Sequence, residues 1–216
     1  MKRYFENGMT VLFQGDSVTD CGRNRDKDCK TLNRMGDGYP LLCKQIYDTL
    51  FPDNTVNFVN RGVSGDRIRD LLTRYDDDFK AVEPDFVSIM IGINDTWRAF
   101  DCGDATSPER FRKEYEELLQ KIKADFPSAK IMILEQFAFT AHPDRIGWDG
   151  DLDAKRAVTR ELAAQYADFF IPIYDVMLGA VKTDFTMAEL SLDGVHPAPV
   201  GHSLIASEIL KALQIL

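Results

Sequence analysis

The sequence predicts an α/β fold in which a five-stranded parallel sheet is covered by helices on both faces, a three-layer α/β/α sandwich. Two observations support this prediction. Short apolar runs alternate with longer amphipathic stretches along the chain, and the runs are rich in β-branched and aromatic residues. No repeat, low-complexity tract or linker interrupts this alternation, so the 216 residues are expected to form a single domain spanning residues 1–216.

The strands and helices of this fold can be placed from the spacing of the apolar residues. Each expected strand is a short run bounded by polar or turn residues, and the five runs are residues 10–14, 56–59, 86–91, 131–136 and 169–173. The stretches between them repeat apolar residues at helical spacing, and Pro40 stands where a first helical turn tolerates proline. The expected helices are residues 40–50, 68–79, 108–126, 153–166 and 199–213.

Composition and charge limit the partners of the chain. The formal net charge is −9, which argues against nucleic acid and anionic membranes because both attract clustered Lys and Arg. Residues 1–7 contain no long apolar run, so neither a secretory signal nor a membrane span is expected, and the protein is expected to be cytoplasmic. A small neutral molecule fits this charge better. A homo-oligomer could form through an exposed Tyr4, Phe5 or Phe100.

No metal or cofactor is expected. The four cysteines lack CxxC spacing and only three histidines accompany them, so the sequence does not favour a structural zinc site. Several aspartates suggest magnesium, yet they lie in separate loops without a phosphate-binding glycine loop; they are Asp16, Asp20, Asp66 and Asp95. In a reducing compartment free thiols are expected, rather than a disulfide between Cys21 and Cys29.

Polar clusters follow the expected strands. Because ligands bind beyond the carboxyl ends of the strands in a parallel sheet, clusters at these ends are expected to converge on one edge. They are Gly15-Asp16-Ser17 after the first strand, Ser64-Gly65-Asp66 after the second, Gly92-Ile93-Asn94-Asp95 after the third, and Asp193-Gly194-Val195-His196 before the last helix. The pattern predicts one site built from four loops.

The residue types in these clusters predict a serine nucleophile. Asp193 precedes His196 by three residues, where its carboxylate can hold the imidazole in the tautomer that takes a proton from the Ser17 hydroxyl. Pro197 disfavours helical geometry at His196, which helps the loop to bring the two side chains together. Each motif alone is more often a turn or a helix cap, but their joint occurrence at strand ends favours hydrolysis.

An oxyanion hole can be assembled from the same loops. Acyl transfer places negative charge on the former carbonyl oxygen, and one donor aimed at it contributes about 2.7 to 4 kcal/mol. The backbone N–H groups of Ser17 and Gly65 and the side-chain amide of Asn94 would supply three donors. Asp16 and Asp95 are expected to fix the two oxyanion loops by accepting hydrogen bonds from backbone N–H groups. The GxSxG elbow of the α/β-hydrolases is absent.

Four sequence blocks carry a resemblance to a known family. They read FQGDSVTD at residues 13–20, NRGVSGD at 60–66, GIND at 92–95 and DGVHP at 193–197. Over nearly its whole length the chain resembles the SGNH hydrolases, also called GDSL-type esterases, with Val18 in place of the family's leucine. The resemblance implies a flavodoxin-like fold and a carboxylic ester hydrolase without a cofactor. It also implies a nucleophile, a base, an orienting acid and oxyanion donors, namely Ser17, His196, Asp193, and Ser17 with Gly65 and Asn94.

A narrower resemblance concerns the substrate. The stretches TDCGR at 19–23, GDGY at 36–39 and SIMIGINDTWR at 88–98 look like those of intracellular bacterial acetylxylan esterases. This implies removal of acetyl groups from carbohydrates such as acetylated xylo-oligosaccharides, through an acyl-enzyme on Ser17. Leu192 stands where that branch often has tryptophan. The alternatives are a lysophospholipase or thioesterase of the same family that acts on longer acyl chains, and a non-catalytic binding domain.

Residues that would bind an acetylated saccharide can also be named. The expected substrate contacts are Asp16, Tyr39, Trp97 and Arg98. Trp97 and Tyr39 would present flat apolar faces to pyranose rings, although Trp97 could instead pack its loop against the sheet. Other side chains could bond sugar hydroxyls or each other, namely Asp20, Arg23 and Arg98. Of the remaining histidines, His142 is expected to be exposed to solvent and His202 to pack or hydrogen-bond in the last helix.

Overall fold

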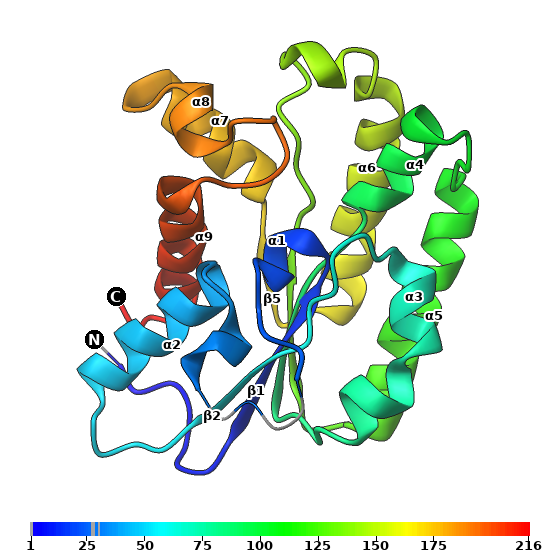
Figure 1. The fold of residues 1–216 in the computed structure, drawn as a ribbon. Helices are drawn as coiled ribbons and strands as arrows, with labels where there is room; N and C mark the ends of the chain where they lie inside the picture. The colour runs from blue at the N-terminus through cyan, green and yellow to red at the C-terminus, as the bar shows by residue number, and fades with distance from the viewer. Residues whose placement is uncertain (1, 27–28, 30) are drawn as a thin grey trace.

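The computed structural model describes residues 2–26, 29 and 31–216, and within them the chain forms a three-layer α/β/α sandwich around a five-stranded sheet (Figure 1). All strand pairs are parallel, in the order β2-β1-β3-β4-β5. The strands are β1 Thr10–Gly15, β2 Asn57–Asn60, β3 Phe86–Met90, β4 Lys130–Leu134 and β5 Phe169–Ile171. The predicted fold class and the predicted strands are confirmed.

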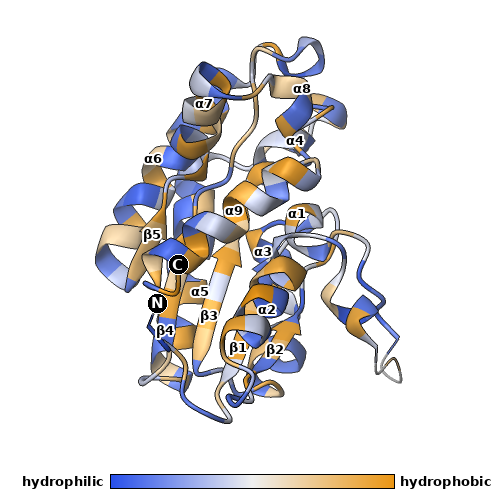
Figure 2. Ribbon diagram, turned by 90° about the vertical axis from the view of Figure 1, so that its left-hand side faces the viewer, coloured by the Kyte–Doolittle hydropathy of each residue, from blue (hydrophilic) through white to orange (hydrophobic). Residues whose placement is uncertain are grey.

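Helices cover both faces of this sheet. They are α1 Ser17–Asp20, α2 Tyr39–Leu50, α3 Ile68–Thr73, α4 Ile93–Asp101, α5 Pro108–Asp125, α6 Asp149–Tyr166, α7 Ile173–Thr183, α8 Met187–Leu190 and α9 Pro199–Ala212. Val11 and Phe13 of β1 join the core under α2, α7 and α9, whereas Leu12 joins the core under α3, α5 and α6. Because both faces of the sheet are covered, the central strands β1, β3 and β4 are mostly apolar, and Figure 2 shows hydrophobic colour along the strands.

The helix predicted over residues 68–79 is interrupted. It ends at Thr73 as α3, and a π turn, Asp76–Lys80, follows. The wider π turn brings Tyr75 and Phe79 into a stacked pair with ring centroids 4.9 Å apart, and both rings are buried. Burial of both aromatic rings therefore accounts for the departure from regular helical spacing.

The sequence patterns did not predict several of the helices, namely α1, α4, α7 and α8. The first turn of α4 includes Asn94 and Asp95, and these polar residues hide its helical pattern. The fifth strand ends at Ile171 rather than at residue 173, because Pro172 has no N–H to donate to the sheet. Pro172 instead precedes the first residue of α7.

The N-terminal aromatic residues pack inward. Phe5 is 4% exposed, and its ring lies 5.3 Å from Phe86 and 5.4 Å from Tyr47, so the prediction of an exposed Phe5 is wrong. Tyr4 is half-buried against the same core, and Phe100 is exposed. Within the described part of the chain the cysteines are free, and no helix is both long and apolar enough to cross a membrane.

Candidate active site

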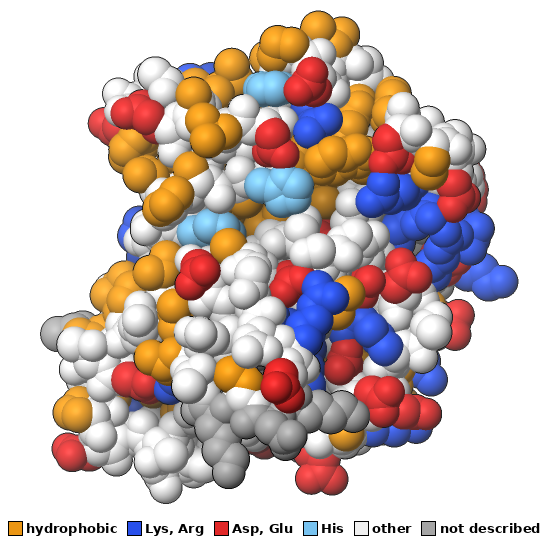
Figure 3. Space-filling model, in the orientation of Figure 1, with side chains coloured by type: hydrophobic (Ala, Val, Ile, Leu, Met, Phe, Trp, Pro, Cys, Tyr) orange, Lys and Arg blue, Asp and Glu red, His pale blue; other side chains and the backbone are white. Residues whose placement is uncertain are grey.

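Four loops meet at the carboxyl edge of the sheet. Ser17 starts α1 directly after β1, and Asn94 lies in the first turn of α4 after β3. Gly65 follows β2, while Asp193 and His196 lie between α8 and α9. In Figure 1 this edge is the upper one, where α1 lies below the orange loop that connects α8 to α9. Figure 3 shows the three histidine side chains on one face of the molecule, bordered by hydrophobic side chains.

Ser17, His196 and Asp193 form a hydrogen-bonded chain. Ser17 Oγ lies 2.8 Å from His196 Nε2, and His196 Nδ1 lies 2.6 Å from Asp193 Oδ2. Partial burial raises the pKa of Asp193, but hydrogen bonds from the His196 ring and from nearby backbone N–H groups outweigh this effect and lower the pKa to about 2. The carboxylate is therefore ionised and accepts from Nδ1–H, which leaves Nε2 to accept the Ser17 proton.

The loop that carries the acid and the base is shaped by its own backbone. Asp193 Oδ1 accepts hydrogen bonds from the N–H groups of Val195 and His196, at 2.9 and 2.7 Å, and so closes a tight turn. Gly194 has a φ of +81°, and a Cβ at this position would lie 2.8 Å from His142 Cβ. Both the backbone conformation and this close approach require glycine.

Buried aspartates bond the backbone of the two loops that are expected to carry oxyanion donors. Asp16 Oδ1 accepts a hydrogen bond from the backbone N–H of Val18 at 3.0 Å and thereby caps the short helix that begins with Ser17. Asp95 Oδ2 accepts from the backbone N–H of Ile68 at 3.4 Å and ties α4 to the start of α3. These hydrogen bonds confirm the loop-fixing roles predicted for Asp16 and Asp95.

Each expected oxyanion donor has an N–H group without an acceptor among the described residues. Asn94 Nδ2 donates one hydrogen bond to the carbonyl oxygen of Asp66 at 3.0 Å, and because an amide carries two N–H groups, the second is left over. The backbone N–H groups of Ser17 and Gly65 have no acceptor among the described residues. Gly65 has a φ of +91°, a conformation that glycine adopts without strain.

Asp20 joins the nucleophile helix to the Gly65 loop, a role that the sequence did not predict. Its Oδ2 accepts hydrogen bonds from the backbone N–H of Ser64 at 3.0 Å and from Ser64 Oγ at 2.7 Å. Arg25 pairs with the same oxygen, and Arg23 Nε lies 3.8 Å from Asp20 Oδ1. Of the two alternatives left open for Asp20 and Arg23, bonds to sugar hydroxyls or to each other, the structure shows the second as an ion pair. The spacing of Asp20 and Ser64 in sequence gave no signal of this contact.

The aspartates that suggested magnesium bond protein groups instead. Asp66 Oδ2 accepts from Arg74 Nε at 2.7 Å, in addition to the contacts of Asp16, Asp20 and Asp95 above. Within the residues that the structure describes, no three His, Cys, Asp or Glu side chains are grouped so that they could hold a metal ion.

Two of the four expected substrate contacts are wrong. Tyr39 is 0% exposed, and its hydroxyl lies 2.8 Å from Thr19 Oγ1, beneath α1. Asp16 is 1% exposed and is occupied with the cap of α1. Asp16 adjoins Ser17 in the sequence and Tyr39 does not, but both side chains are buried, so neither can present a surface to a sugar.

Trp97 and Arg98 do lie beside the site. Both are half-buried in α4, and the centroid of the Trp97 ring lies 5.8 Å from that of His196. Arg98 pairs with Asp101, and its Nη2 lies 3.9 Å from the point that a Cβ on Gly65 would occupy. The indole therefore borders the base, and the guanidinium borders an expected oxyanion donor.

The two other histidines have structural contacts. His142 Nδ1 accepts from the backbone N–H of Asp144 at 3.3 Å, and His142 Nε2 lies 3.1 Å from the carbonyl oxygen of Leu192. His142 is half-buried rather than fully exposed, which departs from the prediction. His202 Nδ1 accepts from the backbone N–H of Tyr39 at 3.2 Å, which confirms its predicted hydrogen-bonding role. Burial, together with the positive charge of a protonated His196, lowers the pKa of His202 to about 4.

Sequence reasoning missed two residues near the base. Arg145 and Trp148 lie at the end of the connection from β4 to α6, where no local motif marks them. Arg145 Nη2 lies 3.7 Å from Asp193 Oδ2, and the Trp148 ring lies 5.5 Å from the Trp97 ring. These contacts join segments about fifty residues apart, so only the folded structure shows them.

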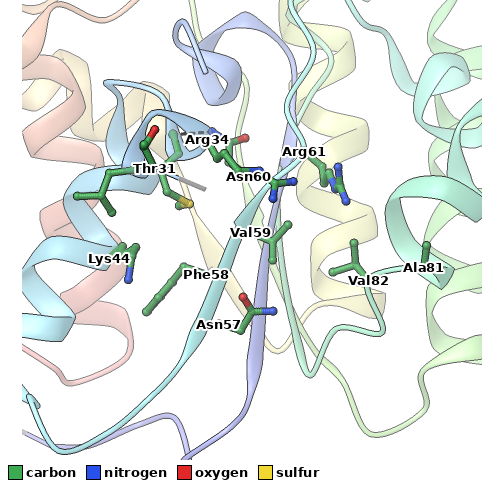
Figure 4. Close-up of a pocket in the computed structure, with 12 residues that line it drawn as sticks. Thr31, Arg34, Lys44, Asn57, Phe58, Val59, Asn60, Arg61, Ala81 and Val82 are labelled. Atoms are coloured by element: carbon green, nitrogen blue, oxygen red, sulfur yellow. Dashed lines mark hydrogen bonds between the residues drawn. The ribbon is translucent and has the colours of Figure 1, made fainter. Parts of the chain in front are cut away.

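A separate cavity lies along the open edge of β2 (Figure 4). It has a volume of about 450 Å³, and its lining includes Phe58 and the basic residues Arg34, Lys44 and Arg61. Lys44 Nζ lies 2.6 Å from Asp48 Oδ2, and Arg61 Nε lies 3.7 Å from Asp78 Oδ1. The residues of the Ser17–His196–Asp193 chain do not line it, so this cavity is distinct from the candidate active site.

Asp16 makes stability depend on pH. Burial raises its pKa to about 7 against the opposing hydrogen bond from Val18. Because the folded pKa exceeds the unfolded value of 3.8, the folded state retains a proton that the unfolded state loses, so this group lowers stability as the pH rises from about 4 to 7. Asp16→Asn keeps an acceptor for Val18 and removes the charge. The free energy of unfolding of Asp16→Asn is compared with that of the wild type at each pH. We expect this difference to be larger at pH 8 than at pH 5 by a few kcal/mol, since each unit of pKa shift corresponds to about 1.4 kcal/mol.

Urea unfolding at the two pH values measures this difference. Asp53→Asn, at an exposed turn position, serves as the matched control and should show no such change with pH. An equal effect of Asp16→Asn at both pH values would contradict the buried, protonated state of Asp16.

Comparisons with known proteins agree with this geometry. A model of the GDSL-like lipase/acylhydrolase family matches residues 13–204. An acetylxylan esterase from Geobacillus stearothermophilus is 31% identical over 208 residues, which cover 96% of this chain and 94% of that protein. Among solved structures, a GDSL-like lipase from Parabacteroides merdae has a TM-score of 0.91 at 31% identity and covers 98% of both chains.

The solved acetylxylan esterase Axe2 from Geobacillus stearothermophilus is also similar. It has a TM-score of 0.86 at 29% identity, over 98% of this chain and 96% of that one. Two further Axe2 structures are described as catalytic mutants, one with a serine and one with a histidine replaced by alanine.

Proposed function

Because the chain belongs to the GDSL-like lipase/acylhydrolase family, and is therefore a carboxylic ester hydrolase, we propose that it removes acetyl groups from carbohydrates such as acetylated xylo-oligosaccharides. The observation that carries the proposal is the hydrogen-bonded chain from Ser17 Oγ through His196 to the ionised Asp193. The substrate class rests on the acetylxylan esterase to which the chain is 31% identical.

In the proposed first step, His196 Nε2 takes the proton from Ser17 Oγ while this oxygen attacks the acetyl carbonyl carbon. The negative charge on the carbonyl oxygen is stabilised by the backbone N–H groups of Ser17 and Gly65 and by the free N–H of Asn94. Asp193 stabilises the imidazolium that forms. His196 then gives its proton to the sugar oxygen as the C–O bond breaks, which leaves an acetyl group on Ser17 and releases the sugar alcohol.

Water completes the proposed reaction. His196 removes a proton from the water molecule, which attacks the acetyl-enzyme, and the same donors stabilise the second oxyanion. The proton then passes to Ser17 Oγ, and acetate leaves. Each step uses only residues of this chain.

The surroundings of the base support a saccharide as the leaving group. Trp97 offers an indole ring 5.8 Å from the His196 ring, the kind of apolar face on which a pyranose ring can lie. Arg98 supplies hydrogen-bond donors beside Gly65. We therefore assign substrate contacts to Trp97 and Arg98 and not to Asp16 or Tyr39.

A second candidate is an esterase for longer acyl chains. Leu192 and Ile146 are 78% and 73% exposed, and they adjoin Asp193 and Arg145 in the sequence. Exposed apolar side chains at the rim of the site would favour an aliphatic chain, since each buried methylene contributes about 0.8 kcal/mol.

Two substrate series distinguish these candidates. Acetate release from acetylated xylo-oligosaccharides tests the proposed substrate, and p-nitrophenyl esters from acetyl to decanoyl test the acyl pocket. We expect acetate release from the saccharides, with kcat/KM falling as the acyl chain lengthens. A rise in kcat/KM toward decanoyl, without acetate release from any acetylated saccharide, would overturn the proposal in favour of a long-chain esterase.

A further inference from the structure

The connection from β4 to α6 contacts three consecutive residues of the loop that carries the acid and the base. The backbone N–H of Phe139 donates to the carbonyl oxygen of Gly194 at 2.7 Å, and His142 Nε2 lies 3.1 Å from the carbonyl oxygen of Leu192. Between them, Arg145 faces the side chain of Asp193. The loop is therefore held from outside as well as by its own turn.

Arg145 packs against both tryptophans of the chain, whose rings also contact each other. Its guanidinium carbon lies 4.2 Å from the centroid of the Trp97 ring and 4.8 Å from that of Trp148. The residue is 8% exposed, and its Nη1 donates to the carbonyl oxygen of Asp144 at 3.1 Å. A guanidinium that lies against two aromatic rings is held by cation–π attraction, which strengthens when water is excluded.

The distance from Arg145 to Asp193 suits an electrostatic role. At 3.7 Å, Arg145 Nη2 is too far from Asp193 Oδ2 for a hydrogen bond, so this oxygen remains available to His196 Nδ1 at 2.6 Å. The charge is nevertheless close, and the burial of Arg145 reduces screening by water on its side of the pair, while the Asp193 side chain stays 37% exposed. It favours the ionised carboxylate and attracts it to the position that it occupies beside His196.

We propose that Arg145 is a positioning residue for the esterase reaction, which holds the Asp193 carboxylate and the Trp97 indole in place beside His196. The inference rests on the proposed serine esterase function and assigns a role to a residue outside the four sequence blocks. Arg145 does not touch the reacting atoms; it acts through Asp193 and Trp97.

Replacement by methionine and by lysine separates the charge from the packing. Arg145→Met is expected to lower kcat for p-nitrophenyl acetate about 10- to 100-fold, because a small displacement of a catalytic group has effects of this size. Arg145→Lys keeps a positive charge and is expected to retain more of kcat than Arg145→Met. Tryptophan fluorescence should change in both variants, since both tryptophans contact Arg145.

Arg156→Met is the matched control. Arg156 is also buried, with its guanidinium carbon 3.5 Å from the centroid of the Tyr174 ring, and it pairs with Asp153 outside the catalytic loops. This variant should lose stability but keep kcat. An equal loss of kcat in Arg156→Met and Arg145→Met, or an unchanged kcat in Arg145→Met, would overturn the proposal.

A double-mutant cycle tests whether Arg145 acts through Asp193. In an Asp193→Asn background, Arg145→Met should lower the remaining kcat by less than about threefold, since the carboxylate that it positions is absent. If Arg145→Met lowered kcat by the same factor in the wild type and in Asp193→Asn, the role of Arg145 would be merely structural. Where Arg145→Met does not fold, Arg145→Lys replaces it in the cycle.

The double-mutant cycle can also be measured as a rate of covalent labelling, which needs no ester substrate. The rate at which a fluorophosphonate labels Ser17 depends on the activation of the serine and not on the sugar. If the labelling rates follow the expected ratios while no acetylated saccharide is hydrolysed, the proposed substrate is wrong and the role of Arg145 stands. Labelling rates that are equal in the wild type and in Arg145→Met overturn the role of Arg145 whatever the substrate.

Discussion

Ser17→Ala is expected to lower ester hydrolysis by about 10⁴-fold or more, because it removes the oxygen that forms the acyl-enzyme. The variant should fold as the wild type does, since among the described residues the Ser17 hydroxyl bonds only the partly exposed His196 ring. Turnover of p-nitrophenyl acetate, with circular dichroism and thermal unfolding on the same samples, measures both expectations.

Ser203→Ala is the matched control for this variant. Ser203 Oγ donates to the carbonyl oxygen of Pro199 on an exposed turn of α9 and takes no part in the relay. This control should retain full activity. If Ser17→Ala kept most of its activity, Ser17 would not be the nucleophile.

Asp193→Asn is expected to reduce kcat by about 10⁴-fold, a loss of the size seen when the acid of another serine hydrolase is made neutral. The amide can still accept through its oxygen from the N–H groups of Val195 and His196, so the loop should keep its shape. What is lost is the charge that stabilises the imidazolium and the acceptor that fixes its tautomer.

The pKa of Asp193 determines the pH range over which the effect of Asp193→Asn is expected. Because its folded pKa of about 2 lies below the unfolded value of 3.8, the carboxylate stabilises the folded loop fully above about pH 4, and this effect is lost only as the pH falls toward 2. The kcat ratio between wild type and Asp193→Asn should therefore persist at pH 6, 7 and 8. Asp53→Asn again serves as an exposed control, and a variant with near-normal kcat would exclude Asp193 as the orienting acid.

The sheet and the relay could be predicted from the sequence because both depend on local patterns. Buried parallel strands read as apolar runs, as in β1 and β3, and the relay residues stand in short motifs at strand ends. Asp193 and His196 are close in sequence, so one turn brings them together. Ser17 joins them because β1 ends at the same edge of the sheet.

The predictions from sequence that failed concern the direction of side chains and the contacts between segments that are distant in the sequence. Tyr39 and Asp16 were expected to contact the substrate, but the start of α2 and the cap of α1 direct their side chains inward. Ser64 meets Asp20, and Arg145 meets Trp97, only after β2, β3 and β4 have brought their loops together. No periodicity or motif encodes such pairs, so the sequence could not reveal them.

The proposed mechanism is tested most directly by the site of covalent labelling. A fluorophosphonate reacts when the activated serine oxygen bonds phosphorus and fluoride leaves, and mass spectrometry of the digested protein identifies the modified residue. The expected result is a single adduct on Ser17 that is absent from Ser17→Ala and forms more slowly in Asp193→Asn. Enzyme that hydrolyses esters yet carries its adduct on another residue, or none, would contradict the assignment of Ser17 as the nucleophile.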